Sequence, residues 1–193
     1  GAVITWGHSG YGGDSSMIRD QLALGVQTIC CTNFSFAAVK DNGSVVTWGC
    51  AETGGDSSSV QCQLVGGVQY LCSTDKAFAA VRDDGSAFSW GHMLWGGDSS
   101  KVKGLLTEGV QALYSTKKAF AAMKDDGSVV TWGDKDHGGD SCAVQADLAG
   151  GVQDITSNGG AFVAYKADGS IVVWGGKTES EAARAKAKEK RAD

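Results

Sequence analysis

A Trp-Gly pair recurs at an interval of 42 residues, and this regularity constrains the fold more than any other feature of the chain. The pair occurs five times, and its tryptophans are Trp6, Trp48, Trp90, Trp132 and Trp174. The triplets Gly-Gly-Asp and Gly-Val-Gln and a single phenylalanine recur at the same interval. A period of this length is typical of propellers and solenoids, in which each unit buries its apolar face only against its neighbours.

The period divides the 193 residues into one array, residues 1–176, and a short tail. Glycine supplies 29 residues and proline none, so glycine must make the turns that need positive φ. We expect a partial repeat at residues 1–24, units that start near residues 25, 67, 109 and 151, and a charged helical tail at residues 177–193.

Within one unit, residues 109–133, the pattern predicts three antiparallel strands. Val110–Ser115 alternates apolar and other residues, and Ala119–Lys124 places Phe120 among small residues as a core side chain. Residues 125–128 have the composition of a tight hairpin turn, and residues 129–132 are β-branched and aromatic. Three strands per repeat is the simplest interpretation.

The segment between Gly-Gly-Asp and the next strand has a different pattern. Val102 and Leu106 keep an i, i+4 spacing that recurs in every copy, which favours a short helix with an Asp or Ser N-cap and Gly109 as its C-cap. An irregular extended segment is the alternative.

The charge balance argues against nucleic acid as a partner. The chain carries a formal charge of -5; the tail contributes +2 and the repeats -7, so phosphate backbones and anionic membranes are disfavoured. No apolar run approaches the roughly 18 residues of a membrane span, although peripheral association through a partner complex stays open. Because the chain begins at Gly1 in the middle of a unit, we expect a processed or trimmed product, with an organellar targeting peptide removed as one option.

The six cysteines, at positions 30, 31, 50, 62, 72 and 142, lack metal-ligand spacing. No C-x-x-C pair and no suitably spaced histidine accompanies them, so we expect no metal framework. They are interpreted as small residues on or near strands, and disulfides remain the alternative.

The stretch Asp126-Gly-Ser-Val-Val-Thr-Trp-Gly133, preceded by a small-residue strand that ends at Lys124, resembles the repeat of the RCC1 (regulator of chromosome condensation) family. The resemblance covers the four full copies and the leading fragment, and the repeats also resemble a divergent 42-residue variety found in long arrays of algal proteins. It implies a β-propeller, and members serve as guanine-nucleotide exchange factors, ubiquitin-ligase modules and protein-binding platforms. It carries no functional residue over to this chain, because Gly-Gly-Asp-Ser-Ser replaces the family's segment after Trp-Gly.

The predicted fold class is therefore mainly β and propeller-like, built from tandem three-stranded units. Four and a fraction copies cannot make the family's usual ring of seven, and residues 3–6 would duplicate the last strand, residues 171–175. Either the N-terminal strand adds to a sheet edge, or the array is an open β-solenoid whose exposed edge invites a partner.

The repeated polar motif is a weak candidate for chemistry. Its glycines and following helix start could form an anion-binding nest. A catalytic site needs different residues that converge on one point, whereas Asp14, Asp56, Asp98 and Asp140 occupy one column of the repeat. We therefore interpret the motif as a structural turn and cap, and expect no catalytic residue, cofactor or metal.

Function is better sought where the copies differ, in the four residues that follow each Trp-Gly pair. These variable windows are residues 8–11, 50–53, 92–95 and 134–137, and they hold all three histidines and the one tryptophan outside the repeated column. Loops on a rigid framework often carry recognition. The alternatives are ordinary exposed loop residues, or a metal or catalytic site. The predicted partner-binding residues are His8, Tyr11, His92, Met93, Leu94, Trp95 and His137, with Arg184 and Lys188 in the tail.

Together these features predict a non-enzymatic interaction or structural subunit of a larger assembly, with an organellar complex of an alga as the specific hypothesis. Its partners would be other protein subunits, bound through the variable windows, an edge strand and the tail. The alternative is an RCC1-type regulatory module, either a guanine-nucleotide exchange factor or a ubiquitin-pathway adaptor.

Overall fold

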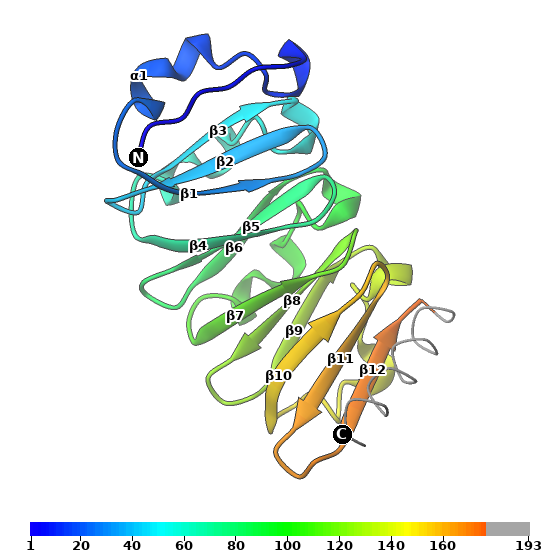
Figure 1. The fold of residues 1–193 in the computed structure, drawn as a ribbon. Coiled ribbons are helices and arrows are strands. Elements are labelled where there is room, and N and C mark those ends of the chain that lie inside the picture. The colour runs from blue at the N-terminus through cyan, green and yellow to red at the C-terminus, as the bar shows by residue number, and fades with distance from the viewer. Residues whose placement is uncertain (177–193) are drawn as a thin grey trace, which may run out of the picture.

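The computed structural model describes residues 1–176, which form four three-stranded antiparallel sheets that follow one another in chain order (Figure 1). Within each sheet the strands are also in chain order. The sheets are β1 (Val26–Cys31), β2 (Ser35–Lys40) and β3 (Val45–Gly49); β4 (Val68–Ser73), β5 (Ala77–Arg82) and β6 (Ala87–Gly91); β7 (Val110–Ser115), β8 (Ala119–Lys124) and β9 (Val129–Gly133); and β10 (Val152–Ser157), β11 (Ala161–Lys166) and β12 (Ile171–Gly175).

The three-strand prediction is confirmed, with β7 and β8 at the expected residues and β9 one residue longer. The first pairing of each sheet contains a bulge, because the register shifts between Val110 and Ala112 and at the equivalent positions of the other sheets. The glutamine of Gly-Val-Gln is the extra residue, and its side chain is exposed. The second pairing is regular and sets Phe120 opposite Trp132.

The core lies between successive sheets. Small residues on one face of β5, Ala77 and Ala79, pack against Phe120 and Trp132 of the next sheet. The contact repeats one unit later, where β8 packs on Phe162 and Trp174. Alanine on one side lets the sheets approach closely, while the aromatic rings fill the space on the other. Phe120 is fully buried, which confirms it as a core residue.

Short helices connect each sheet to the next, and they correct the helix prediction. All but one are 3-10 helices, and the segment after Asp98 ends at Leu105 with Leu106 as its cap. Gly109 therefore does not cap it; its φ of +72° turns the chain into β7. The helices are η1 (Ser9–Tyr11), η2 (Ser16–Ile18), α1 (Arg19–Leu22), η3 (Ala51–Thr53), η4 (Ser58–Gln63), η5 (Met93–Trp95), η6 (Ser100–Leu105), η7 (Lys135–His137) and η8 (Cys142–Val144).

The described residues form an open array, with β1 and the N-terminal segment at one end and β12 at the other (Figure 1). The predicted strand at residues 3–6 is not a strand, because no described segment pairs with its outer edge. The predicted tail, residues 177–193, lies outside the described residues. None of the described helices is both long enough and apolar enough to cross a membrane.

Candidate interaction face

The variable windows share one backbone attachment to the sheets. In the windows at residues 50–53, 92–95 and 134–137, the first N–H donates to a carbonyl in the turn between the first two strands, as His92 does to Lys76 at 2.9 Å. A threonine in that turn donates back to the window: Thr74 bonds to the carbonyl of Trp95 at 2.9 Å, and Thr116 to that of His137 at 2.9 Å. The backbone of each window is thus fixed by hydrogen bonds to its own N–H and carbonyl groups, while the window side chains differ from copy to copy.

The turns that carry these windows are joined across units. Asn33 N–H donates to the carbonyl of Asp75 at 2.9 Å, Asp75 to that of Lys117 at 3.0 Å, and Lys117 to that of Gly159 at 3.2 Å. Each bond links one sheet to the next. The ladder therefore sets the turns, and the windows bonded to them, along one edge of the array, which we call the loop face.

The window at residues 92–95 is the most apolar part of the loop face. Met93 and Leu94 are each 66% exposed. Trp95 is half-buried, with Lys76 Nζ 4.6 Å and Lys118 Nζ 4.7 Å from the centre of its ring. Cation–π contacts of this kind hold the ammonium groups near the indole. The same window therefore presents two exposed apolar side chains, at Met93 and Leu94, and an indole that holds two cations.

The other predicted window residues make local contacts. His8 stacks on Tyr11 at a centroid distance of 4.4 Å, and Tyr11 contacts Phe34 at 4.7 Å. His137 Nδ1 lies 2.6 Å from Asp134 Oδ1. Within residues 1–176 no group of three or more His, Cys, Asp or Glu residues is placed to hold a metal ion. Arg184 and Lys188 lie outside the described residues.

Residues beside Trp95 were missed by the sequence analysis. Lys76 and Lys118 occupy one repeat column, whose other members are Phe34 and Gly160. In the first unit this column supplies the ring that contacts Tyr11, and in the next two it supplies the lysines that flank Trp95. A comparison of the copies outside the four-residue windows would have shown this second variable column.

The repeated acidic motif has the structural role that was predicted. Asp98 Oδ1 accepts a hydrogen bond from Ser100 N–H at 2.9 Å, and Asp14, Asp56 and Asp140 bond in the same way to the residue two positions on. Hydrogen bonds from the Ser100 side chain and backbone hold the pKa of Asp98 below its ordinary value. These carboxylates form turns at the starts of 3-10 helices, which accounts for them without a ligand.

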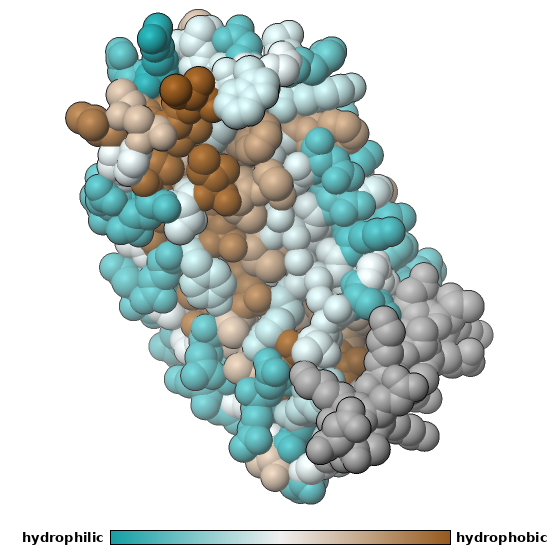
Figure 2. Space-filling model, viewed as in Figure 1, coloured by the Kyte–Doolittle hydropathy of each residue, from teal (hydrophilic) through white to brown (hydrophobic). Residues whose placement is uncertain are grey.

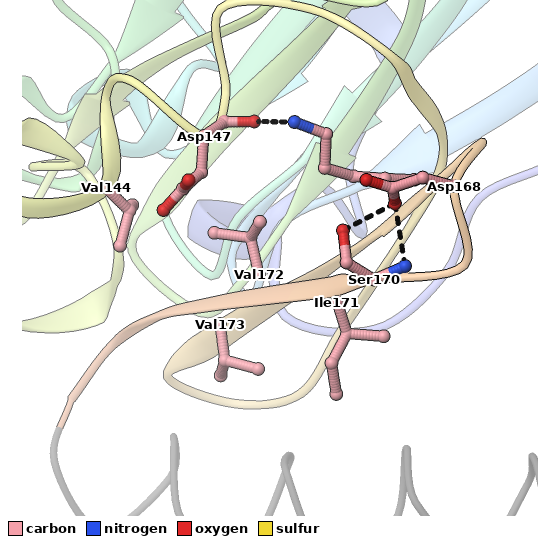
Figure 3. A pocket seen from close by; sticks show the side chains of 8 residues that line it. Val144, Asp147, Asp168, Ser170, Ile171, Val172 and Val173 are labelled. Atoms are coloured by element: carbon pink, nitrogen blue, oxygen red, sulfur yellow. Dashed lines mark hydrogen bonds between the residues drawn. The ribbon is translucent and has the colours of Figure 1, made fainter.

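Two grooves recur with the repeat, and each is lined by a connection and by the third strand of the sheet that follows it. One groove, of about 440 Å³, lies between Val144, Asp147 and the start of β12 (Figure 3). Lys166 Nζ donates there to the Asp147 carbonyl at 2.7 Å. The positions two repeats earlier line a second groove of about 500 Å³, and there Arg82 donates to the Gln63 carbonyl at 2.7 Å. Because equivalent positions of the repeat line both grooves, each groove is a space beside a packed connection and not a unique active site.

The arrangement of the sheets is shared with known structures. The first is yeast RCC1 (Prp20) in a crystal structure described as Kap60 bound to yeast RCC1, with a TM-score of 0.57, 18% identity, and coverage of 83% of this chain and 45% of that one. The fold is RCC1-like. Prp20p from Saccharomyces cerevisiae, in a second structure, gives a TM-score of 0.55 at 18% identity over 81% and 45% of the two chains. Human WBSCR16 gives 0.53 at 18% identity over 80% and 48%.

This chain spans about half the length of each of these proteins. No protein-family model and no curated protein sequence matches the chain. At 18% identity the likeness concerns the arrangement of the backbone, and the RCC1-like fold by itself does not assign a function.

Proposed function

We propose that this protein is a non-enzymatic interaction subunit that binds another protein through its loop face. The observation that carries the proposal is the pair of exposed side chains, Met93 and Leu94, on a window whose backbone is fixed to the sheet. Exposed apolar side chains on a fixed loop can be buried by a partner at little cost in backbone entropy. The partner would offer an apolar surface to Met93 and Leu94 and an anionic group to Lys76 and Lys118.

The repeat geometry favours a scaffold over an enzyme. The acidic residues with lowered pKa values accept hydrogen bonds from their own turns, in the same way in successive units. Catalysis requires an asymmetric set of groups around one reacting centre. In this chain the differences between the copies of the repeat are instead concentrated in the window side chains.

The loop-face proposal is tested by quantitative co-purification from the native source. A double variant, Met93→Ser with Leu94→Ser, should lose its partner while keeping its unfolding midpoint, because both side chains are exposed. Leu105→Ser is the matched control, since Leu105 is also an exposed leucine but lies in η6, outside the loop face. Equal recovery of the partner by the wild type, the double variant and the Leu105→Ser control would refute the proposal.

The resemblance to algal repeats extends the proposal to a subunit of an organellar complex in an alga. Fractionation of intact plastids and mitochondria, followed by native electrophoresis, tests this extension. A single soluble species outside both organelles would contradict it.

A regulatory role is the second candidate, and the shared fold with two structures of yeast RCC1 is the observation that favours it. One of those structures is described with binding of Prp20p to Gsp1p and histones. For this chain the role would be nucleotide exchange or ubiquitin-pathway adaptation. A nucleotide-release assay with a panel of small GTPases separates the exchange role from the first proposal, because only an exchange factor accelerates release.

A further inference from the structure

The N-terminal segment lies where the third strand of a preceding unit would lie. Val26 N–H donates to the carbonyl of Gly1 at 3.0 Å, and Val3 N–H to that of Leu22 at 3.0 Å. One repeat later, Val68 N–H donates to Gly43 at 3.0 Å and Val45 N–H to Leu64 at 2.9 Å. The hydroxyls of Thr5 and Ser15 lie 2.7 Å apart, as those of Thr47 and Ser57 do at 2.9 Å.

The other edge of this segment is open. In a strand, successive backbone groups point to opposite edges. Gly1 bonds to Val26 of the first sheet and Val3 to Leu22 of the connection before it, whereas no backbone hydrogen bond joins Ile4 or Trp6 to another described residue. An edge of this kind is a template for an added strand.

Trp6 shows what an added strand would carry. The four other tryptophans of its column are 1–6% exposed, and each stacks on a phenylalanine of the middle strand at 5.2–5.4 Å between ring centres. Trp6 is 83% exposed, and so is Ile4. A middle strand set against residues 3–6 would bring its phenylalanine to Trp6, as Phe36 lies opposite Trp48.

The same strand would cover the open face of the first sheet. Between later sheets, alanines of the middle strand cover the next phenylalanine and tryptophan. At the N-terminal end this cover is absent among the described residues, and Ile29 is 46% exposed where the equivalent Ile155 is 2%. Val3, Trp6, Ile29, Phe36 and Trp48 line a groove there of about 270 Å³. Figure 2 shows hydrophobic surface gathered at this end of the array.

We propose that this N-terminal groove binds one antiparallel strand with the character of a middle strand of this repeat, supplied from outside the 193 residues. The strand would place a phenylalanine opposite Trp6, small residues opposite Thr5 and Ile4, and an aliphatic residue opposite Val3, as β8 does against β9. All four middle strands within residues 1–176 are already paired on both edges. A second copy therefore has no free strand of this kind within its described residues. The inference does not depend on the loop face.

The probe is a peptide with the sequence of residues 109–126, which spans β7 and β8 and contains no cysteine. It is titrated into the full chain, and binding is followed by NMR. Saturable shifts are expected at residues 3–6, at Ile29 and at the indoles of Trp6 and Trp48. Trp6→Ala in the chain, or Phe120→Ala in the peptide, should each weaken binding at least about tenfold, since buried aromatic pairs dominate such contacts. Leu105→Ala in the chain, at an exposed side chain outside this groove, should leave binding unchanged.

A tethered variant tests the same contact even where the separate peptide binds weakly. The sequence of residues 109–126, which ends in Asp-Asp, is placed directly before Gly1, so that it meets Gly1 as Asp125 and Asp126 meet Gly127. Burial of Trp6 should shift its indole emission to the blue and raise the unfolding midpoint, and Phe120→Ala within the added segment should reverse both effects. The proposal is overturned if Trp6 stays exposed in the tethered protein, or if the chain alone dimerises through Trp6 on concentration.

Discussion

Trp90 donates its indole N–H to the backbone carbonyl of Gly54 at 3.1 Å, although the two residues are 36 positions apart. The same bond joins Trp48 to Gly12, Trp132 to Gly96 and Trp174 to Gly138 at 3.0–3.1 Å. Each bond fastens a third strand to the connection that enters its own unit. The Trp-Gly pair therefore recurs with a structural hydrogen bond that closes each unit.

Replacement of Trp90 by phenylalanine should destabilise the fold by about 1–3 kcal/mol, because the buried Gly54 carbonyl loses its donor. Urea unfolding measures the change in free energy. Trp6→Phe is the control in the same column, and it should change stability by less than about 0.5 kcal/mol because Trp6 is exposed. Equal effects at the two positions would contradict the assignment.

Truncation of Phe120 to alanine should cost about 3–5 kcal/mol, as large core truncations do. Phe120 is fully buried between two sheets, whereas Phe36 lies in the same column at the open N-terminal face and is only half-buried. Phe36→Ala should therefore cost clearly less in the same unfolding experiment. A cost at Phe36 equal to that at Phe120 would mean that the N-terminal face is covered in solution.

Acid should destabilise the protein in part through the repeated aspartates. Hydrogen bonds from the backbone and side chain of Ser58 lower the pKa of Asp56, and Asp14, Asp98 and Asp140 are lowered in the same way. A lowered folded-state pKa gives stabilisation that is present above the unfolded pKa of about 3.9 and lost as pH falls through the lower folded value.

The expected result is a smaller loss of stability between pH 7 and pH 3 in a variant with all four aspartates changed to asparagine than in the wild type. Urea midpoints at both pH values measure this difference. Identical losses of stability in the two proteins would show that these four aspartates do not have lowered pKa values in the folded state.

The six cysteines should differ in their rates of reaction with a thiol reagent. All six are free thiols in the structure. Burial raises the pKa of Cys72 to about 11, so its reactive thiolate is scarce at pH 8. Cys31 and Cys62 are exposed and should react promptly with a thiol reagent, whereas Cys72 is half-buried and should react much more slowly. Mass spectrometry of the labelled peptides checks the order, and labelling of Cys72 as fast as that of Cys31 would contradict the raised pKa.

The strands could be predicted from the sequence because period, alternation and turn composition coincide in every copy. The limits of β7 and β8 follow directly from the bounding glycine and hairpin residues. The connections could not be predicted as well, since i, i+4 spacing of Val102 and Leu106 fits both an α-helix and a 3-10 segment followed by a bend. Tertiary packing of Leu106, which is buried, decides between them.

The windows and the column of Lys76 and Lys118 are identifiable as variable from the sequence, but the contacts between them are not. The contacts of Lys76 and Lys118 with Trp95 bring together residues from three different segments, and local patterns contain no signal for such contacts. Likewise the exposure of Trp6 depends on the absence of a neighbouring sheet, although its local sequence matches that of four buried tryptophans.

The central claim is that a repeated framework presents windows whose side chains are required for binding the partner, and a window exchange tests it most directly. His92 and Asp134 make equivalent backbone bonds, so residues 92–95 can be replaced by the sequence of residues 134–137 with little strain. We expect the unfolding midpoint to stay within a few degrees of the wild type while the native partner is lost from co-purification. Retention of the partner by a folded exchange variant would contradict the claim.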